Sequence, residues 1–107
     1  MSKYSSALAE AASDIANSGF AASEYGTVEY GTGWNGLVWV SLDVLHNLDV
    51  DEELVTEVLK DFPEIRTGEA LVWIREDSQG FVTVENCTML DVDRLREDFD
   101  KAADEDE

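Results

Sequence analysis

Carboxylates recur at helical spacing near the end of the chain. At 100° per residue they fall within about 60° of one another, almost opposite an apolar stripe that includes Leu95 and Phe99. A helix rises 1.5 Å per residue, so successive carboxylates are separated by about 5–6 Å, similar to the spacing of phosphates along a nucleic-acid strand. Such a row is able to occupy a basic protein groove in place of phosphates. Its members are Asp93, Glu97, Asp100 and Asp104.

A comparable row lies in the middle of the chain and is expected to support the first. Like charges at positions i and i+4 each cost a helix a few tenths of a kcal/mol, so the chain tolerates a repeated destabilisation. The alternative interpretation is that each row is only the solvated face of an amphipathic helix. The residues of this second row are Glu53, Glu57 and Asp61, followed by Glu64.

The overall charge favours a role for the acids beyond solubility. Twenty-five Asp and Glu face seven Lys and Arg, which gives a formal net charge of −18. Solubility alone needs a magnitude of only about 2–8. A charge of −18 repels phosphate, which argues against direct binding to nucleic acid or to an anionic membrane. It attracts basic protein surfaces instead.

Adaptation to molar salt is the competing explanation of the charge. Concentrated salt screens self-repulsion to within about 3 Å, so a heavily acidic surface becomes tolerable and stays hydrated. A low lysine content suits such an environment, and the chain has only Lys3, Lys60 and Lys101. In this interpretation the acids reflect the habitat and carry no information about activity.

Residues suited to catalysis are scarce. A nucleophile needs a nearby base, and Cys87 and His46 lie in no recognisable motif. The segment Gly31-Thr32-Gly33 lacks the spacing and the following Lys of a phosphate-binding loop. The acidic segments at Asp49 and Asp91 lack the EF-hand pattern, and helix capping accounts for both. We therefore expect no enzymatic activity, no cofactor and no metal site.

Aromatic residues cluster around a predicted hairpin turn. The dipeptide Asn35-Gly36 favours a type I′ turn, which needs positive φ at both central positions. That turn would pair Trp34 with Leu37 and place three aromatic side chains on one face of the ribbon, opposite Val38 and Val40. This face is either part of the core or an exposed partner surface, and the sequence leaves both open. The three residues are Tyr30, Trp34 and Trp39.

Apolar periodicity predicts helices over residues 2–17, 50–62 and 91–103. Asp49 is the predicted N-cap of the second helix, and Pro63 ends it. Strands at 70–75 and 81–86 form a second predicted hairpin. Residues 43–48 are compatible with a helical turn or with a strand end.

The predicted order α-ββ-α-ββ-α indicates an α+β fold, with a four-stranded, mostly antiparallel sheet built from two hairpins and packed on helices. A chain of 107 residues fits one domain, predicted over residues 1–103, and residues 104–107 are expected to form a frayed acidic tail. The first residues have no secretory pattern, and no window approaches the roughly 18 apolar residues of a membrane helix. We expect a cytoplasmic protein, in the host cytoplasm if it is viral.

The sequence thus favours a non-enzymatic interaction protein that presents carboxylates to a basic partner, such as a nuclease or another nucleic-acid-handling factor. Its small, very acidic profile is similar to that of phage and mobile-element inhibitors that imitate DNA. The alternative is a salt-adapted (halophilic) intracellular or virion structural protein whose aromatic sheet face makes the contacts. A homodimer remains open in both cases.

Overall fold

A computed structural model of the chain describes residues 6–17, 23–29, 33–48, 50–77 and 79–105. The side chains of residues 23–29, 33–34 and 103–105 are outside this description. The elements in chain order are α1 (Ser6–Asn17), β1 (Ser23–Glu29), β2 (Gly33–Ser41), α2 (Leu42–Asn47), α3 (Glu52–Asp61), the 3₁₀ helix η1 (Pro63–Arg66), β3 (Glu69–Glu76), β4 (Val82–Thr88) and α4 (Val92–Glu105).

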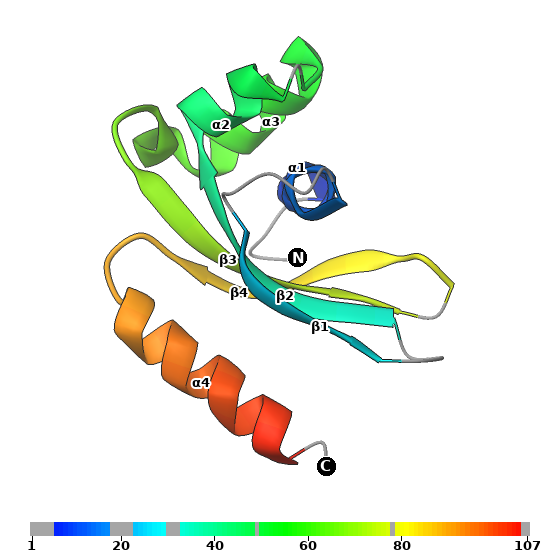
Figure 1. The fold of residues 1–107 in the computed structure, drawn as a ribbon. Coiled ribbons are helices and arrows are strands. Elements are labelled where there is room, and N and C mark those ends of the chain that lie inside the picture. Colours follow the sequence, from blue (N-terminus) through cyan, green and yellow to red (C-terminus); the bar gives the residue numbers. More distant parts are fainter. Residues whose placement is uncertain (1–5, 18–22, 30–32, 49, 78, 106–107) are drawn as a thin grey trace.

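The sheet separates the helices into two layers. Its strands are antiparallel and lie in the order β1-β2-β3-β4. Helices α1, α2 and α3 cover one face, and α4 lies alone on the other (Figure 1). The predicted α+β class, an antiparallel sheet packed on helices, is confirmed.

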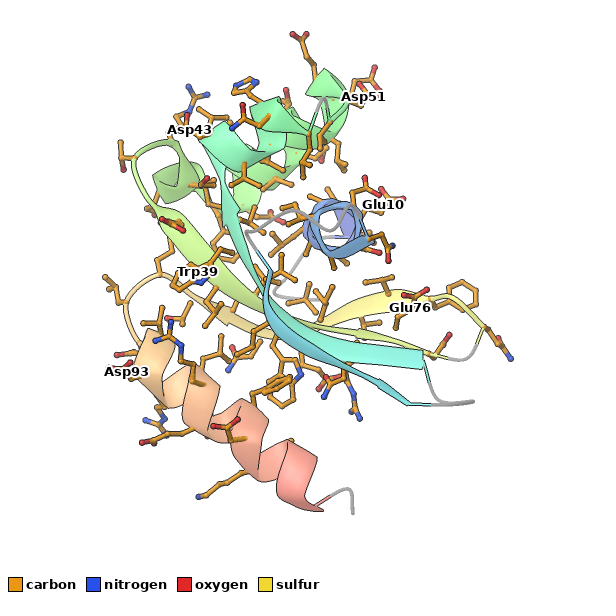
Figure 2. The ribbon with its side chains drawn as sticks, viewed as in Figure 1. Glu10, Trp39, Asp43, Asp51, Glu76 and Asp93 are labelled. Carbon is orange, nitrogen blue, oxygen red and sulfur yellow. The ribbon has the colours of Figure 1, made fainter. Side chains whose placement is uncertain are left out.

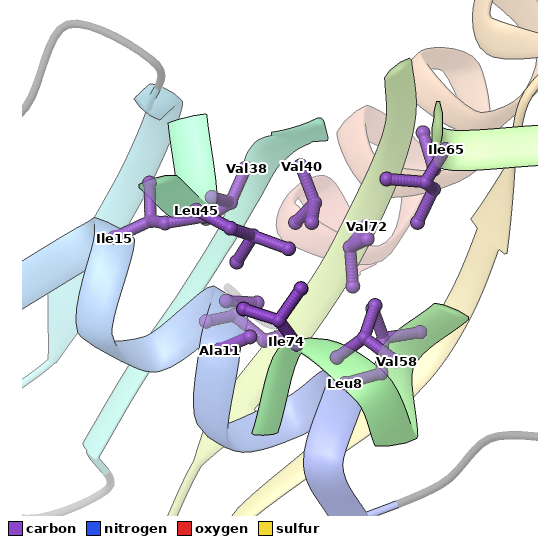
Figure 3. Close-up of a cluster of buried hydrophobic side chains, with 13 residues drawn as sticks. Leu8, Ala11, Ile15, Val38, Val40, Leu45, Val58, Ile65, Val72 and Ile74 are labelled. Atoms are coloured by element: carbon purple, nitrogen blue, oxygen red, sulfur yellow. The ribbon is translucent and has the colours of Figure 1, made fainter. Parts of the chain in front are cut away.

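The main hydrophobic cluster lies between the sheet and α1–α3 (Figure 3). Alternate residues of β2 and β3, such as Val38, Val40 and Val72, point into it because side chains alternate between the faces of a strand. Leu8 and Ile15 of α1 fill it from the opposite side. These five side chains are fully buried, so this cluster is the centre of the fold.

A second cluster, here called the α4 cluster, lies on the other face of the sheet. Its fully buried strand residues are Leu37 and Leu71, which occupy the alternate positions of the same two strands. Leu95 and Phe99 of α4 pack onto them, and their exposures are only 2% and 3%. The choice between the two sheet faces, which the sequence left open, is therefore resolved: each face has its own helical cover.

The predicted turn at Asn35-Gly36 is wrong. Strand β2 passes straight through these residues, and Trp34 pairs with Val28 of β1 instead of with Leu37. On the other side of β2, Asn35 and Gly36 pair with Arg75 and Ile74 of β3. A central strand has its backbone groups paired on both edges, and this tertiary pairing overrides the local turn preference. Residues 30–32, where the chain passes from β1 to β2, lie outside the described residues.

The helix boundaries refine the remaining predictions. The undecided segment after β2 is the helix α2, whose first turn is capped by Ser41: its Oγ accepts a hydrogen bond from Val44 N at 3.2 Å. The N-cap of α3 is Asp51, which accepts from Glu53 N at 3.1 Å, and the predicted cap, Asp49, lies outside the described residues. Helix α4 continues to Glu105, beyond the predicted end at 103.

Candidate functional site

The carboxylate row on α4 faces away from the sheet. Leu95 and Phe99 hold the opposite side of the helix against the α4 cluster. As a result Asp93, Glu97 and Asp100 are exposed, as the helical spacing predicts. The side chain of Asp104 lies outside the described residues, although its backbone is helical.

Basic residues share the exposed surface of α4. Arg94, Arg96 and Lys101 are three of the seven Lys and Arg in the chain, so six acids and three bases leave this helix a formal charge of −3. Asp93 already has a cationic partner, because its Oδ1 lies 3.2 Å from Nη1 of Arg96. The α4 surface is therefore a mixed-charge surface, and it is a poorer imitation of a phosphate row than the acids alone suggest.

The second row lies on the other side of the sheet. Glu53, Glu57 and Asp61 are exposed on α3, and Glu57 lies 3.5 Å from Lys60 in a solvent-exposed pair of the kind that contributes little stability. Because α3 and α4 cover opposite faces, the two predicted rows do not form one surface (Figure 1). The partner-binding role predicted for the α3 acids stays a prediction, and it would have to operate on the face of the sheet opposite to α4.

Carboxylates of α3 instead lie around the same groove as carboxylates of α1. An open groove, here called the α1–α3 groove, consists of two adjoining hollows that have Glu10, Asp51 and Leu54 in common. No Lys or Arg is among the described residues that line it. Figure 2 shows Glu10 and Asp51 on this side of the sheet and Asp93 on the other. The carboxylates of the groove are Glu10, Asp14, Asp51, Glu53 and Glu57.

Three carboxylates of the groove were not among the partner-binding residues predicted from the sequence: Glu10, Asp14 and Asp51. Glu10 and Asp14 are spaced i,i+4 opposite the buried Leu8 and Ile15, so the signal for an acidic face on α1 was present. Two acids alone are an ordinary solvated face, and only the packing of α1 beside α3 gives them neighbours. Asp51 was not predicted because the local sequence favoured Asp49 as the N-cap of α3.

The aromatic residues of the sheet hold α4 in place. Trp39 is half-buried in the α4 cluster, and the guanidinium carbon of Arg96 lies 5.7 Å from its ring centroid. Trp73 makes an edge-on contact with Phe99, with 5.7 Å between the ring centroids. Its Nε1 donates a hydrogen bond to Asn35 Oδ1 at 2.6 Å. Among the three predicted aromatic contact residues, only the side chain of Trp39 is described, since Tyr30 and the side chain of Trp34 lie outside the described residues.

The candidate catalytic and metal-binding residues are dispersed. Cys87 is half-buried on β4 and packs against the main cluster, whereas His46 is exposed near the end of α2. Within the part of the chain that the structure describes, no group of three or more His, Cys, Asp or Glu is placed to hold a metal ion.

The α1–α3 groove combines exposed carboxylates with the partly buried apolar residues Ala7, Leu54 and Val82. Over the same described residues, no helix has the length and hydrophobicity needed to cross a membrane. The chain matches no protein-family model, and comparisons with curated proteins and with solved structures found no match either.

Proposed function

We propose that this protein is a non-enzymatic binding protein whose α1–α3 groove takes a basic surface of another protein. The observation that carries the proposal is a set of five carboxylates around one groove, from α1, α3 and the N-cap of α3. No Lys or Arg lines this groove among the described residues. A net charge of −18 adds long-range attraction to basic partners, which gives fast and salt-sensitive association.

The partner class follows from the chemistry that the groove imitates. Clusters of Lys and Arg that accept a line of negative charges belong above all to proteins that bind nucleic acid. We therefore propose that the protein acts as a DNA mimic and inhibitor, of the phage or mobile-element type, in the cytoplasm. The α4 row, with Asp93, Glu97 and Asp100, is a second and weaker surface because Arg94, Arg96 and Lys101 interrupt it.

Displacement of DNA from a basic protein tests this function. A labelled duplex bound to each of several basic, non-specific nucleases is titrated with the protein, and fluorescence anisotropy reports release of the DNA. We expect displacement at about 0.1 M KCl that weakens steeply as salt rises. The variant Glu10→Gln/Glu53→Gln/Glu57→Gln is expected to lose most of this activity.

Two matched variants remove the same charge elsewhere. Asp43→Asn/Glu69→Gln/Glu85→Gln neutralises three exposed acids on α2, β3 and β4, outside both surfaces, and is expected to retain displacement. Asp93→Asn/Glu97→Gln/Asp100→Asn measures the share of the α4 row. Equal losses in all three variants would mean that total charge alone acts, and the proposed site would be wrong.

One observation favours salt adaptation as a second candidate function. Exposed acids occur on nearly every described element, from Asp43 on α2 to Glu69 and Glu85 on the sheet, and not only around the groove. Figure 2 shows labelled carboxylates on several sides of the molecule, with Asp43 and Asp93 far apart. Such a dispersed charge suits a halophilic intracellular or virion protein, and the dependence of folding on salt separates it from the first proposal.

A further inference from the structure

We infer that the segment of the basic partner that the α1–α3 groove binds is an amphipathic, Lys/Arg-rich helix. This inference rests on the proposed function and adds the form of the partner segment. The partly buried apolar residues that line the groove are called its floor, and the exposed carboxylates that line it are called its rim. The inference follows from these two features together.

The floor carries exposed apolar surface where two helices and a strand meet. Ala7 comes from α1, Leu54 from α3 and Val82 from β4. All three are only partly buried, and their inner sides pack against the main cluster. The floor is therefore held in place by the core while its outer side remains open to a ligand. Covering it with an apolar side chain removes further apolar area from water.

The rim fixes the sign of the charge on the occupant. Carboxylates approach the floor from both helices, with Glu10 and Asp14 on α1 and Glu53 and Glu57 on α3. The nearby Lys60 is an exposed partner of Glu57 and does not line either hollow. Charge complementarity therefore requires a cationic segment that also carries an apolar side chain.

A helix meets both requirements over a short length. Its residues at i, i+3 and i+4 form one apolar stripe, and the positions beside that stripe are free to carry Lys or Arg. A DNA-binding surface made only of loops or strands offers cations without an apolar stripe, so it would leave Leu54 uncovered. The apolar floor thus favours a nucleic-acid-binding partner that presents an amphipathic basic helix.

Two peptides of identical composition test the inference. Each has about 18 residues of Leu, Ala, Lys and Arg; one places Leu along a helical stripe, and the other has the same residues in an order without a stripe. Anisotropy titrations at about 0.1 M KCl compare their affinities for the full chain. We expect the striped peptide to bind at least about tenfold more tightly.

Two variants locate the binding site. Leu54→Ala is expected to remove most of the preference for the striped peptide while leaving the weaker peptide unaffected. Ser6→Lys places a cation at the wall of the groove without touching the core, since Ser6 is exposed, and is expected to weaken binding of both peptides severalfold. Thr83→Lys, an exposed position on β4, adds the same charge outside the groove and serves as the control for Ser6→Lys.

The outcomes separate the two proposals. Equal affinity for both peptides, with loss in Ser6→Lys but not in Thr83→Lys, overturns the helix inference and leaves the basic-partner function standing. Equal losses in Ser6→Lys and Thr83→Lys, or no binding of either peptide, overturn the groove as a site and the proposed function with it. If Leu54→Ala is poorly folded by circular dichroism, the striped-peptide preference in Val82→Thr, a nearly isosteric polar change on the same floor, decides instead. We expect that preference to fall, and an unchanged preference would overturn the helix inference.

Discussion

Asn35 illustrates how a residue with a strong local preference acquires a different role in the folded chain. Next to Gly36 it favours a turn, yet it is the third of the nine residues of β2. Its Oδ1 accepts a hydrogen bond of 2.6 Å from Trp73 Nε1, a partner 38 positions away in the sequence. The side chain therefore helps to fix Trp73 against Phe99 beneath α4.

Replacement of Asn35 by Ala tests this role. The part-buried indole N–H of Trp73 would lose its acceptor, so we expect the free energy of unfolding to fall by about 1–3 kcal/mol. Urea unfolding followed by tryptophan fluorescence measures the change. Asn47→Ala, at the exposed end of α2, is the control and should change stability by less than about 0.5 kcal/mol. An Asn35→Ala variant as stable as this control would show that the side-chain bond contributes nothing.

At the scale of single residues, periodicity predicted the inward-facing positions well. Leu95 and Phe99 were expected to face inward on α4 and are buried, because helical spacing alone determines a helix face. The cap of α3 and the partner of Asn35 were not predictable in the same way. Both are determined by contacts between residues far apart in the sequence, and the local sequence carries little information about such contacts.

Helix α4 is the element with the most separate packing. It contributes Leu95 and Phe99 to a cluster that lies on the opposite face of the sheet from the main cluster. Met89, Leu90 and Asp91 connect it to β4, and Leu90 is 91% exposed. A terminal helix with few fully buried side chains is expected to open at lower free energy than the core.

Phe99→Ala tests whether α4 opens on its own. Truncation of a buried Phe costs about 3–5 kcal/mol, and we expect this loss to appear first as detachment of α4. Hydrogen exchange should then accelerate in α4 while α1 and β2 stay protected, and the fluorescence of Trp39 and Trp73 should shift to the red. Val58→Ala, in the main cluster, is the comparison and should accelerate exchange throughout the chain. Equal acceleration of α1 and α4 in Phe99→Ala would contradict separate packing.

Elements were predictable where periodicity and Pro or capping residues agreed. The helix that ends before Pro63 and the hairpin of β3 and β4 were placed to within a few residues. The continuity of β2 was not, because the pairing of a central strand with two neighbours is a long-range property. The groove also depends on long-range packing, because Glu10 and Glu53 line the same hollow only when α1 packs beside α3.

At the scale of the whole molecule, charge is the dominant feature. The chain carries −18, and among the described side chains none that is charged is buried. Exposed carboxylates repel one another, so the folded state tolerates a cost that salt would relieve. If the acids serve partner binding, this repulsion must be small enough for the protein to fold at low salt. If they are an adaptation to molar salt, the repulsion at low salt can be much larger.

The dependence of folding on salt is the most direct test of the central claim that the carboxylates serve binding. Thermal unfolding is followed by circular dichroism from about 0.05 M to about 3 M KCl, over which the Debye length falls from more than 10 Å to less than 3 Å. We predict a protein that is already folded at the lowest salt, with a gain in Tm that levels off within a few tenths molar. A chain that folds only at molar KCl would contradict the binding function and identify its acidic surface as an adaptation to salt.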